Sequence, residues 1–397
     1  MQFSLRTRLV FSRGPTLDQT LPLVLIGQSG LEVAVDENVL RQRLAYRLEL
    51  EVHMDRLRRT RRANLGSMAV ELKRAIDVHH HWLPRELIDH VERYLPDGYS
   101  VRKQELVKHV LDPQGQRVQS IHVEPFSDVT RRLQLMDEAG IQVALLSPGC
   151  FPQWITLQAA HLINDAAADL LAHYGERLRP MVHVPPFGEP GILEEMERGA
   201  RLGLTGVCMS TNFHGLYPDD QAYLPFLNKA AELSLPVFVH AAGTPVHYED
   251  LRPYGLATPL GRSIDLCLVP IRLIYGGVLE RIPNLKLVIA HLGGSFAFHV
   301  KRFFGAPVEG GQPFPVGRAQ RAMDQLLFDT APAFWHGPAE IEFALGSLGM
   351  SRVTLGSDYP HGHGALKQAT DHVQALPLTP SEKQQIAGEN LRRFYGL

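Results

Sequence analysis

Short apolar runs alternate with longer segments of helical periodicity along most of this chain, and that alternation limits the folds it can adopt. It repeats eight times after residue 74, in runs that we expect to be strands: Ala75–His79, Val143–Ser147, Arg179–Val184, Gly206–Ser210, Pro236–His240, Leu285–His291, Leu326–Thr330 and Val353–Asp358. Most of these runs are continuously apolar, as is typical of parallel strands buried on both faces. The pattern therefore predicts an α/β protein, a (β/α)8 TIM barrel.

The segments between these strands carry apolar residues at the spacing of a helix with one buried face. The expected helices are Val129–Ala139, Leu157–His173, Pro190–Leu202, Asp220–Leu233, Pro270–Arg281, Phe296–Phe304, Ala339–Leu348 and Pro380–Phe394. Each would return the chain along the outside of a closed parallel sheet. We assign residues 68–397 to this barrel domain.

The first 67 residues differ from the rest in their basic residues. Every basic residue here is arginine, and lysine first occurs at Lys73. We expect residues 1–67 to be an N-terminal extension that is dispensable or poorly ordered, with Met68 as the native start. The spacing of leucines within Val39–Arg62 predicts one amphipathic helix. The alternative is that the arginines bind an anionic partner.

The composition excludes several classes of partner. With 40 basic and 42 acidic residues the formal net charge is −2, so no overall field attracts nucleic acid or an anionic membrane. No apolar run reaches the roughly 18 residues expected of a membrane-spanning helix. The cysteines, Cys150, Cys208 and Cys267, are far apart and odd in number, which argues against a disulfide framework. We expect a cytoplasmic protein whose partner is a small molecule.

Ionisable residues gather at the carboxyl ends of the expected strands. His79 and His81 end or follow the first strand, His240 ends the fifth, His291 the sixth and Asp358 the eighth. In a closed parallel barrel these ends open on one face, and that face carries the active site. We therefore expect these side chains to meet.

Two of these histidines, His79 and His81, are two residues apart, so both project to one face of a strand. By itself the pair fits a structural role equally well, but together with His240 and Asp358 it indicates a metal site. Four nitrogen and oxygen ligands suit one divalent ion, Zn2+ in the first place and Mn2+ as the alternative. The end of the fourth strand, Val207–Thr211, offers no Lys, Asp or Glu to bridge a second ion.

His291 opens the run His-Leu-Gly-Gly-Ser, in which two glycines allow a tight turn after the strand. We predict that His291 is the general acid or base, because a positioned imidazole and a metal-bound water together supply hydroxide near neutral pH. The alternative is that His291 is a further metal ligand or supports one.

Five ordered motifs make residues 75–397 resemble the metal-dependent amidohydrolase superfamily. Within it they resemble the branch that includes 2-amino-3-carboxymuconate 6-semialdehyde decarboxylase and gamma-resorcylate decarboxylase. The motifs are Ile76–His81 with Leu83 and Pro84, Leu135–Ile141, Pro236–His240, Ala290–Gly294 and Leu355–Pro360. The resemblance implies a single metal held by the four ligands named above. It also implies that catalysis falls to His291, through an activated water, or to Asp358 as the proton donor.

Arg302, His361 and Trp82 are the expected substrate-binding residues. Arg302 follows His291 by eleven residues, and at that spacing the resemblance implies an arginine that reaches a substrate carboxylate across a homodimer interface. The alternative for Arg302 is a solvated helix arginine. His361 and Trp82 follow the eighth and first strands, where they can bind substrate or pack at the rim. Further loop candidates are His247, Tyr248, His363, Phe151 and Trp154.

Two catalytic functions fit these residues. We expect a nonoxidative decarboxylase of an aromatic or muconate-like carboxylic acid, in which the metal holds the carboxylate and an acid protonates the carbon that CO2 leaves. The alternative is a metal-dependent hydrolase of a lactone, amide or carbon–carbon bond, because the same water, metal and base would attack a carbonyl. A barrel retained only for binding would be expected to lose a ligand, and all five positions are filled.

Overall fold

The structure is a computed structural model, and it describes residues 23–26, 32–35, 72, 74–149, 155–246, 248–251, 253–305, 316–362 and 364–397. The chain divides into two units, Met1–Ser67 and Met68–Leu397. In the first unit, β1 (Leu23–Ile26) pairs antiparallel with β2 (Glu32–Val35). The helix expected at Val39–Arg62 lies outside the described residues.

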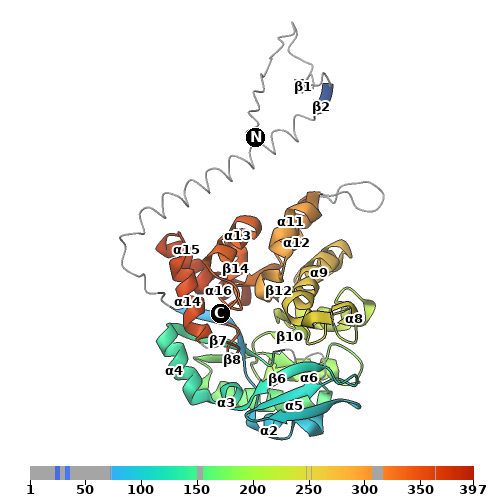
Figure 1. The fold of residues 1–397 in the computed structure, drawn as a ribbon, viewed down its shortest axis with the longest axis vertical. Helices are drawn as coiled ribbons and strands as arrows, with labels where there is room; N and C mark the ends of the chain where they lie inside the picture. Colours follow the sequence, from blue (N-terminus) through green and yellow to red (C-terminus); the bar gives the residue numbers. More distant parts are fainter. Residues whose placement is uncertain are drawn as a thin grey trace. The chain divides into compact units, whose positions relative to one another are not determined.

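The second unit contains the predicted parallel barrel, with a strand at each of the expected positions (Figure 1). The strands are β3 (Ala75–His81), β7 (Ile141–Ser147), β8 (Leu178–Pro180) with β9 (Val182–His183), β10 (Val207–Ser210), β11 (Val237–His240), β12 (Leu287–Ile289), β13 (Leu326–Asp329) and β14 (Val353–Thr354). Every neighbouring pair among them is parallel. The α/β TIM-barrel fold predicted from the alternation is therefore confirmed.

Backbone hydrogen bonds close the barrel between its first and last strands. The His81 N–H donates to Tyr359 O at 2.7 Å, and the Asp358 N–H donates to His79 O at 2.9 Å. These bonds extend the short strand β14 along β3 to the level of the expected metal ligands. The first and eighth strands consequently hold their functional side chains side by side.

The buried carboxylate of Asp77 also holds together this junction between β3 and the residues that follow β14, which we call the seam. It accepts hydrogen bonds from the Ser357 N–H at 3.0 Å, the Ser357 hydroxyl at 2.5 Å and the His79 N–H at 3.0 Å. His80 Nδ1 lies 2.9 Å from the same carboxylate. Each of these buried polar groups would be costly to leave without a partner, so the seam has one strongly preferred register.

Helices surround the barrel and connect its strands, and most begin and end close to the expected residues. They are α2 (Arg85–Asp89), α3 (Val123–Ser127), α4 (Val129–Ala139), α5 (Leu157–Tyr174), α6 (Ile192–Arg201), α7 (Leu224–Glu232), α8 (Tyr248–Leu251), α9 (Arg262–Tyr275), α10 (Val278–Arg281), α11 (Phe296–Gly305), α12 (Val316–Met323), α13 (Pro338–Leu348), α14 (Ala365–Ala375), α15 (Pro380–Gln384) and α16 (Asn390–Tyr395). Shorter 3-10 or π turns are η2 (Val91–Tyr94), η4 (Gln221–Tyr223), η5 (Pro253–Gly255), η6 (Ala257–Gly261), η7 (His291–Gly293), η8 (Met350–Arg352) and η9 (Gln385–Glu389). None of the helices in the described residues combines the length and apolarity needed to span a bilayer.

Local signals explain why α4 matches its expected bounds. The Asp128 side chain accepts a hydrogen bond from the Arg131 N–H and caps the first turn. At the other end Gly140 has a φ of 72°, the left-handed conformation in which glycine commonly ends a helix.

Some helix and strand boundaries differ from the prediction. The helix expected to start at Pro270 starts at Arg262, so Pro270 lies inside α9 although proline favours a first turn. The sixth strand ends at Ile289 because the chain turns sharply at His291. The third strand is divided at Met181, because β8 before this residue pairs with β7 and β9 after it pairs with β10.

A small antiparallel sheet was not expected from the sequence. It consists of β4 (Ser100–Gln104), β5 (Val107–Leu111) and β6 (Arg117–His122), and α3 follows directly after β6 (Figure 1). Helix α14 was also not expected. The sheet lies between the first and second barrel strands in the sequence, so it is an insertion that leaves the barrel order unchanged.

We propose that residues 1–67 are dispensable for the barrel, because every barrel strand lies at or after Ala75. A chain that starts at Met68 is expected to fold with the same far-ultraviolet circular dichroism per barrel residue and to melt within a few degrees of the full chain. Insoluble or unfolded protein would contradict this expectation and would make the first unit part of the folding core.

Candidate metal centre

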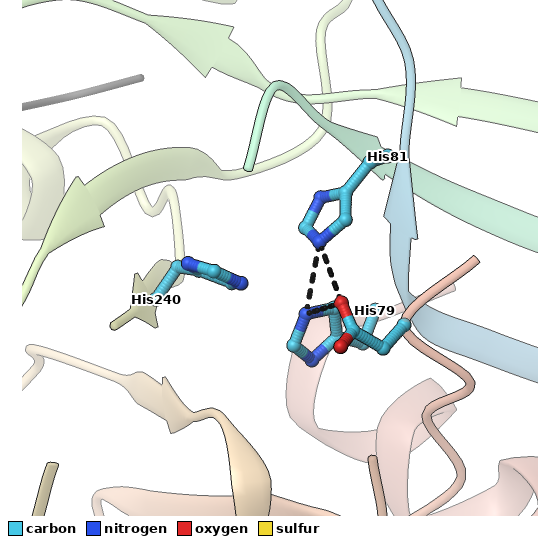
Figure 2. A group of neighbouring side chains, drawn as sticks. His79, His81 and His240 are labelled. Atoms are coloured by element: carbon cyan, nitrogen blue, oxygen red, sulfur yellow. Dashed lines mark hydrogen bonds and ion pairs between the residues drawn. The ribbon is translucent and has the colours of Figure 1, made fainter. Parts of the chain in front are cut away.

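Three histidines and one aspartate converge at the carboxyl end of the barrel. His79 and His81 come from β3, His240 ends β11, and Asp358 follows β14. All four side chains are buried, and one possible ligand atom from each lies within 4.8 Å of the others. Figure 2 shows the imidazoles of the three histidines turned toward one common region.

The hydrogen bonds of the three rings fix which nitrogen of each is available. Each ring is bonded through Nδ1 to a protein acceptor: His79 to Asp329 Oδ2 (2.8 Å), His81 to Ser147 O (3.3 Å) and Oγ (3.0 Å), and His240 to Ala241 O (2.9 Å). Because carboxylates and carbonyls only accept, each Nδ1 carries a proton, and Nε2 is the ring nitrogen that would bind an ion once any proton on it is displaced. An acceptor behind Nδ1 that directs Nε2 outward is the usual arrangement of metal-binding histidines.

The charges in the cluster favour a bound cation. His81 Nε2 lies 2.9 Å from Asp358 Oδ1 and 3.2 Å from His79 Nε2. Burial would lower the pKa of His79, but the carboxylates of Asp329 and Asp358 raise it to about 10. Burial would raise the pKa of Asp358, but His79 and His81 outweigh it and hold that pKa well below its ordinary range. The four donors therefore fit a divalent ion in both type and charge.

The chain turns sharply after β12 and brings His291 to the cluster. The four residues His291–Gly294 have φ angles of 55°, 53°, 68° and 59°. This left-handed backbone suits glycine but strains His291 and Leu292, as is common at functional sites. A Cβ atom on Gly294 would lie 2.1 Å from Ser263 O, so the turn requires glycine there.

The imidazole of His291 lies beside the candidate metal ligands. Its ring centroid is 4.8 Å from that of His79 and 5.4 Å from that of His240. His291 Nδ1 is buried and has no hydrogen-bond partner among the described residues. Burial lowers the pKa of His291 to about 3. The ring is therefore neutral at neutral pH, and one of its nitrogens has a lone pair that can accept a hydrogen bond.

Asp329, which the sequence analysis did not select, connects His291 to the cluster. Its Oδ2 accepts the Nδ1 hydrogen bond of His79 at 2.8 Å, and its Oδ1 accepts from the His291 N–H at 3.0 Å and the Ala331 N–H at 2.9 Å. His79, His291 and Asp329 also form a second group whose ligand atoms lie close together. The sequence does contain a signal for Asp329, because this residue ends the apolar run Leu326–Asp329. Asp358 stands in the same way at the end of another apolar strand.

A cavity of about 220 Å3 opens beside the cluster. It is lined by His240, Thr258, Arg262, Ser263, Leu266, His291, Pro332, Phe334, Trp335, His336, Asp358 and His361. His361, a predicted substrate-binding residue, thus borders the cavity, and its ring centroid lies 5.4 Å from that of His81. Burial lowers the pKa of His361 to about 4, so this ring is also neutral at neutral pH.

The other predicted substrate-binding residues are not among those that line this cavity. Trp82 is buried directly after β3, and its N–H donates to Ser147 O at 3.0 Å. Arg302 is exposed on α11. Since the resemblance assigns Arg302 to the site of a second subunit, its role stays a prediction, as does that of Trp82. The side chains of His247, Tyr248, His363, Phe151 and Trp154 lie outside the described residues.

Comparisons with known proteins identify the family of the chain. The amidohydrolase family model matches residues 76–397, and the chain belongs to this family. The 2-amino-3-carboxymuconate-6-semialdehyde decarboxylase of Dictyostelium discoideum is 27% identical over 345 residues, which cover 81% of this chain and 91% of that protein. A 2-keto-4-carboxy-3-hexenedioate hydratase of Sphingobium is 23% identical over 288 residues, which cover 66% of this chain and 81% of that protein.

A solved structure has the same fold. It is a 5-carboxyvanillate decarboxylase mutant from Novosphingobium aromaticivorans with bound manganese and 3-methoxy-4-hydroxy-5-nitrobenzoic acid. The TM-score is 0.68 at 21% identity, and the match covers 83% of this chain and 99% of that chain. Several further relatives are also decarboxylases by name.

The cluster predicts one divalent ion per chain. His81→Ala removes an Nε2 donor, so this variant is expected to lose most of its metal, whereas His173→Ala changes an exposed histidine of α5 and keeps it. Elemental analysis of the purified proteins measures the metal content. Two tightly bound ions per chain, or a full metal content in His81→Ala, would contradict this assignment.

Asp329 is expected to set the metal affinity without binding the ion itself. Asp329→Ala removes the acceptor behind His79, and loss of such a group typically weakens metal binding roughly 10- to 100-fold. Competition with a chelator of known affinity measures the change. The control is Asp169→Ala, an exposed position on α5. Equal metal affinity in both variants would show that Asp329 does not orient His79.

Proposed function

We propose that this protein is a metal-dependent nonoxidative decarboxylase of an aromatic or muconate-like carboxylic acid, an amidohydrolase-family carboxy-lyase. The observation that carries the proposal is the cluster of His79, His81, His240 and Asp358, of which His240 and Asp358 line a small cavity. The names of most relatives support the same reaction type. A cavity of about 220 Å3 is smaller than the roughly 300–1,000 Å3 of drug-sized ligand sites. It suits a single substituted ring or a short diene.

We propose that the four clustered residues hold one ion, Zn2+ in the first place and Mn2+ as the alternative. Three imidazole nitrogens and one carboxylate suit Zn2+, and imidazole with carboxylate also binds Mn2+. The manganese in a related solved structure supports the second choice. When bound, the ion would supply positive charge that holds a substrate carboxylate and stabilises negative charge beside it.

The chain's own residues must then exclude water and deliver one proton. Loss of CO2 from R–COO⁻ leaves an electron pair on carbon, and a proton completes R–H. Leu266, Pro332, Phe334 and Trp335 give the cavity apolar walls, and the rings of Phe334 and Trp335 meet edge to face at 5.2 Å. Such walls suit a planar substrate and limit the entry of water.

Two residues are placed to move that proton. His291 is neutral, and its buried Nδ1 can bind and orient a water beside the metal-binding side chains. Asp358 is ionised and can pass on a proton only after it has taken one. Both residues line the cavity. We therefore assign catalytic roles to His291 and Asp358 and keep both proton routes.

We also propose that the protein is a homodimer. Phe298 and Phe343 are 71% and 50% exposed on the neighbouring helices α11 and α13, and their ring centroids lie 6.1 Å apart. Exposed paired aromatic rings are typical of protein interfaces. Arg302 lies on α11, one turn from Phe298. A second copy that covers these rings would therefore come close to Arg302, the arginine expected to cross a dimer interface.

A cytoplasmic location is proposed from the thiols. Cys208 and Cys267 are both buried and free among the described residues. Buried free cysteines are common where the compartment keeps thiols reduced.

Hydrolysis is the alternative function, and one comparison favours keeping it. The relative from Sphingobium is named as a hydratase, so addition of water also occurs among relatives of this chain. With an ion held by the same cluster, a water oriented by His291 would attack the carbonyl carbon of a lactone or an amide. It could equally attack the carbonyl conjugated to a vinylogous carbon–carbon bond. The substrate carboxylate would be retained in that case.

A substrate screen separates these functions. Metal-loaded protein is expected to release one CO2 per substrate consumed from at least one hydroxybenzoate, carboxyvanillate-like or carboxymuconate acid. Carbon dioxide release and product mass measure the reaction. Addition of one water to a lactone or amide without CO2 release would contradict decarboxylation and favour the hydrolase.

His291→Ala is expected to keep its metal and lose roughly a hundredfold or more in kcat, the typical contribution of a positioned proton-transfer group. The physical reason is that the ligand set is already complete with four other residues. Steady-state rates and elemental analysis are measured together, with His173→Ala as the exposed histidine control. Parallel loss of metal and rate would make His291 a ligand and overturn the assigned role.

A further inference from the structure

Arg262 is a positively charged residue in the cavity that neither the metal cluster nor the proposed proton transfer uses. It is the first residue of α9, and it lines the cavity together with His240, His291, Asp358 and His361. Arg262 therefore borders the same small space as His240 and Asp358 of the candidate metal cluster.

The guanidinium of Arg262 has no protein partner in the part of the chain that the structure describes. Its Nε atom is buried without a hydrogen-bond partner, and no ion pair links Arg262 to a described residue. Other arginines nearby are engaged: Arg272 on the same helix contacts Asp219 at 2.7 Å, and buried Arg132 donates to backbone carbonyls. Asp358 is the one carboxylate among the described lining residues, and it is engaged by His79 and His81.

An unpaired, partly buried guanidinium costs free energy unless an anion completes it. The fork of N–H donors in arginine matches a carboxylate in two hydrogen bonds. The cavity thus offers two separate sites for negative groups, one at the metal cluster and one at Arg262. A ligand that fills a cavity of about 220 Å3 would contact both.

Two contacts hold the first turn of α9 in place, so the backbone that carries Arg262 is fixed before a ligand binds. Buried Asp265, one turn after Arg262, accepts hydrogen bonds from the Tyr217 hydroxyl at 2.7 Å and the Asn212 amide at 2.9 Å. The backbone of Ser263 packs directly against Gly294 in the His291 turn. The loop after the fourth strand and the turn after the sixth therefore both position the arginine.

We infer that Arg262 binds a second carboxylate of the substrate, one that the reaction leaves in place, so that the preferred substrate class is a planar dicarboxylic acid. This inference rests on the proposed decarboxylase function, since it takes the scissile carboxylate to be at the metal cluster. Arg262 acts as a specificity residue. A monocarboxylic acid of the same size leaves the guanidinium unpaired and binds less tightly.

The test uses binding and not turnover, with two inert probes and metal-loaded full-length protein. Isophthalate carries two carboxylates on one ring and benzoate carries one. Calorimetry is expected to show that isophthalate binds the wild-type protein more tightly than benzoate. Arg262→Gln should weaken isophthalate binding roughly 10- to 100-fold, the typical effect of losing a hydrogen-bonded charge, and change benzoate binding less than about threefold.

Two further variants make the result specific. Arg262→Lys keeps the positive charge but lacks the two-pronged guanidinium, so its affinity for isophthalate is expected to lie between those of the wild type and Arg262→Gln. Arg262→Lys also replaces Arg262→Gln in the test if that variant fails to fold or to hold metal. Arg281→Gln on α10, an exposed position outside the cavity lining, should bind both probes as the wild type does.

Several results would overturn the inference. In the first, isophthalate does not bind the wild type, or binds it no more tightly than benzoate does. In the second, Arg262→Gln and Arg262→Lys leave isophthalate affinity unchanged. In the last, the variants lose affinity equally for both probes. The last would place Arg262 on the carboxylate that both probes share. If the substrate screen finds no CO2 release but the probes behave as expected, the decarboxylase proposal fails while the anion site at Arg262 stands.

Discussion

The buried carboxylate of Asp329 is the interaction on which the arrangement of the site depends. One of its oxygens fixes the proton of His79 on Nδ1, and the other holds the backbone of His291 in a left-handed turn. The same side chain therefore directs a metal-binding nitrogen and places the neutral imidazole next to it. In the proposed mechanism, ion binding and proton transfer would thus be coupled through one buried group that does not itself line the cavity.

The closure of the barrel supplies the other half of the site. Strand β14 is short, and the residues after it are held against β3 by Asp77, Ser357 and two backbone hydrogen bonds. Asp358 follows with a φ of 67°, a strained conformation for aspartate that this seam stabilises. This backbone conformation places the Asp358 carboxylate beside His79 and His81. Stability of the seam and geometry of the cluster consequently depend on the same few residues.

Much of the fold follows from the sequence because buried parallel strands leave a strong local pattern. The barrel strands are apolar runs, and the histidines of the cluster stand at their ends, where the topology brings them together. The sheet of β4, β5 and β6 leaves a weaker pattern. Ser100–Gln104 is charged and mostly exposed, although the turn between β5 and β6 has a clear signal in Asp112, which accepts from the N–H groups of Gln114 and Gln116.

The parts of the site that the sequence does not reveal depend on contacts between distant residues. Asp329 gains its role only when β13 lies between the sixth and eighth strands, β12 and β14. Arg262 resembles an ordinary helix arginine in the sequence, and it enters the cavity because Asp265 binds Asn212, more than fifty residues away in the chain. Arg302, which the family resemblance predicts from its spacing to His291, is exposed in the single chain, so its predicted role would require a second copy.

Anomalous X-ray scattering from crystals of the metal-loaded protein locates a bound ion without reference to activity, so it tests whether His79, His81, His240 and Asp358 bind the metal. The account predicts one anomalous peak per chain, within bonding distance of the Nε2 atoms of His79, His81 and His240 and of the Asp358 carboxylate. A peak between His79, His291 and Asp329, the other group of possible ligands, would contradict it and would make His291 a ligand and not the proton-transfer residue.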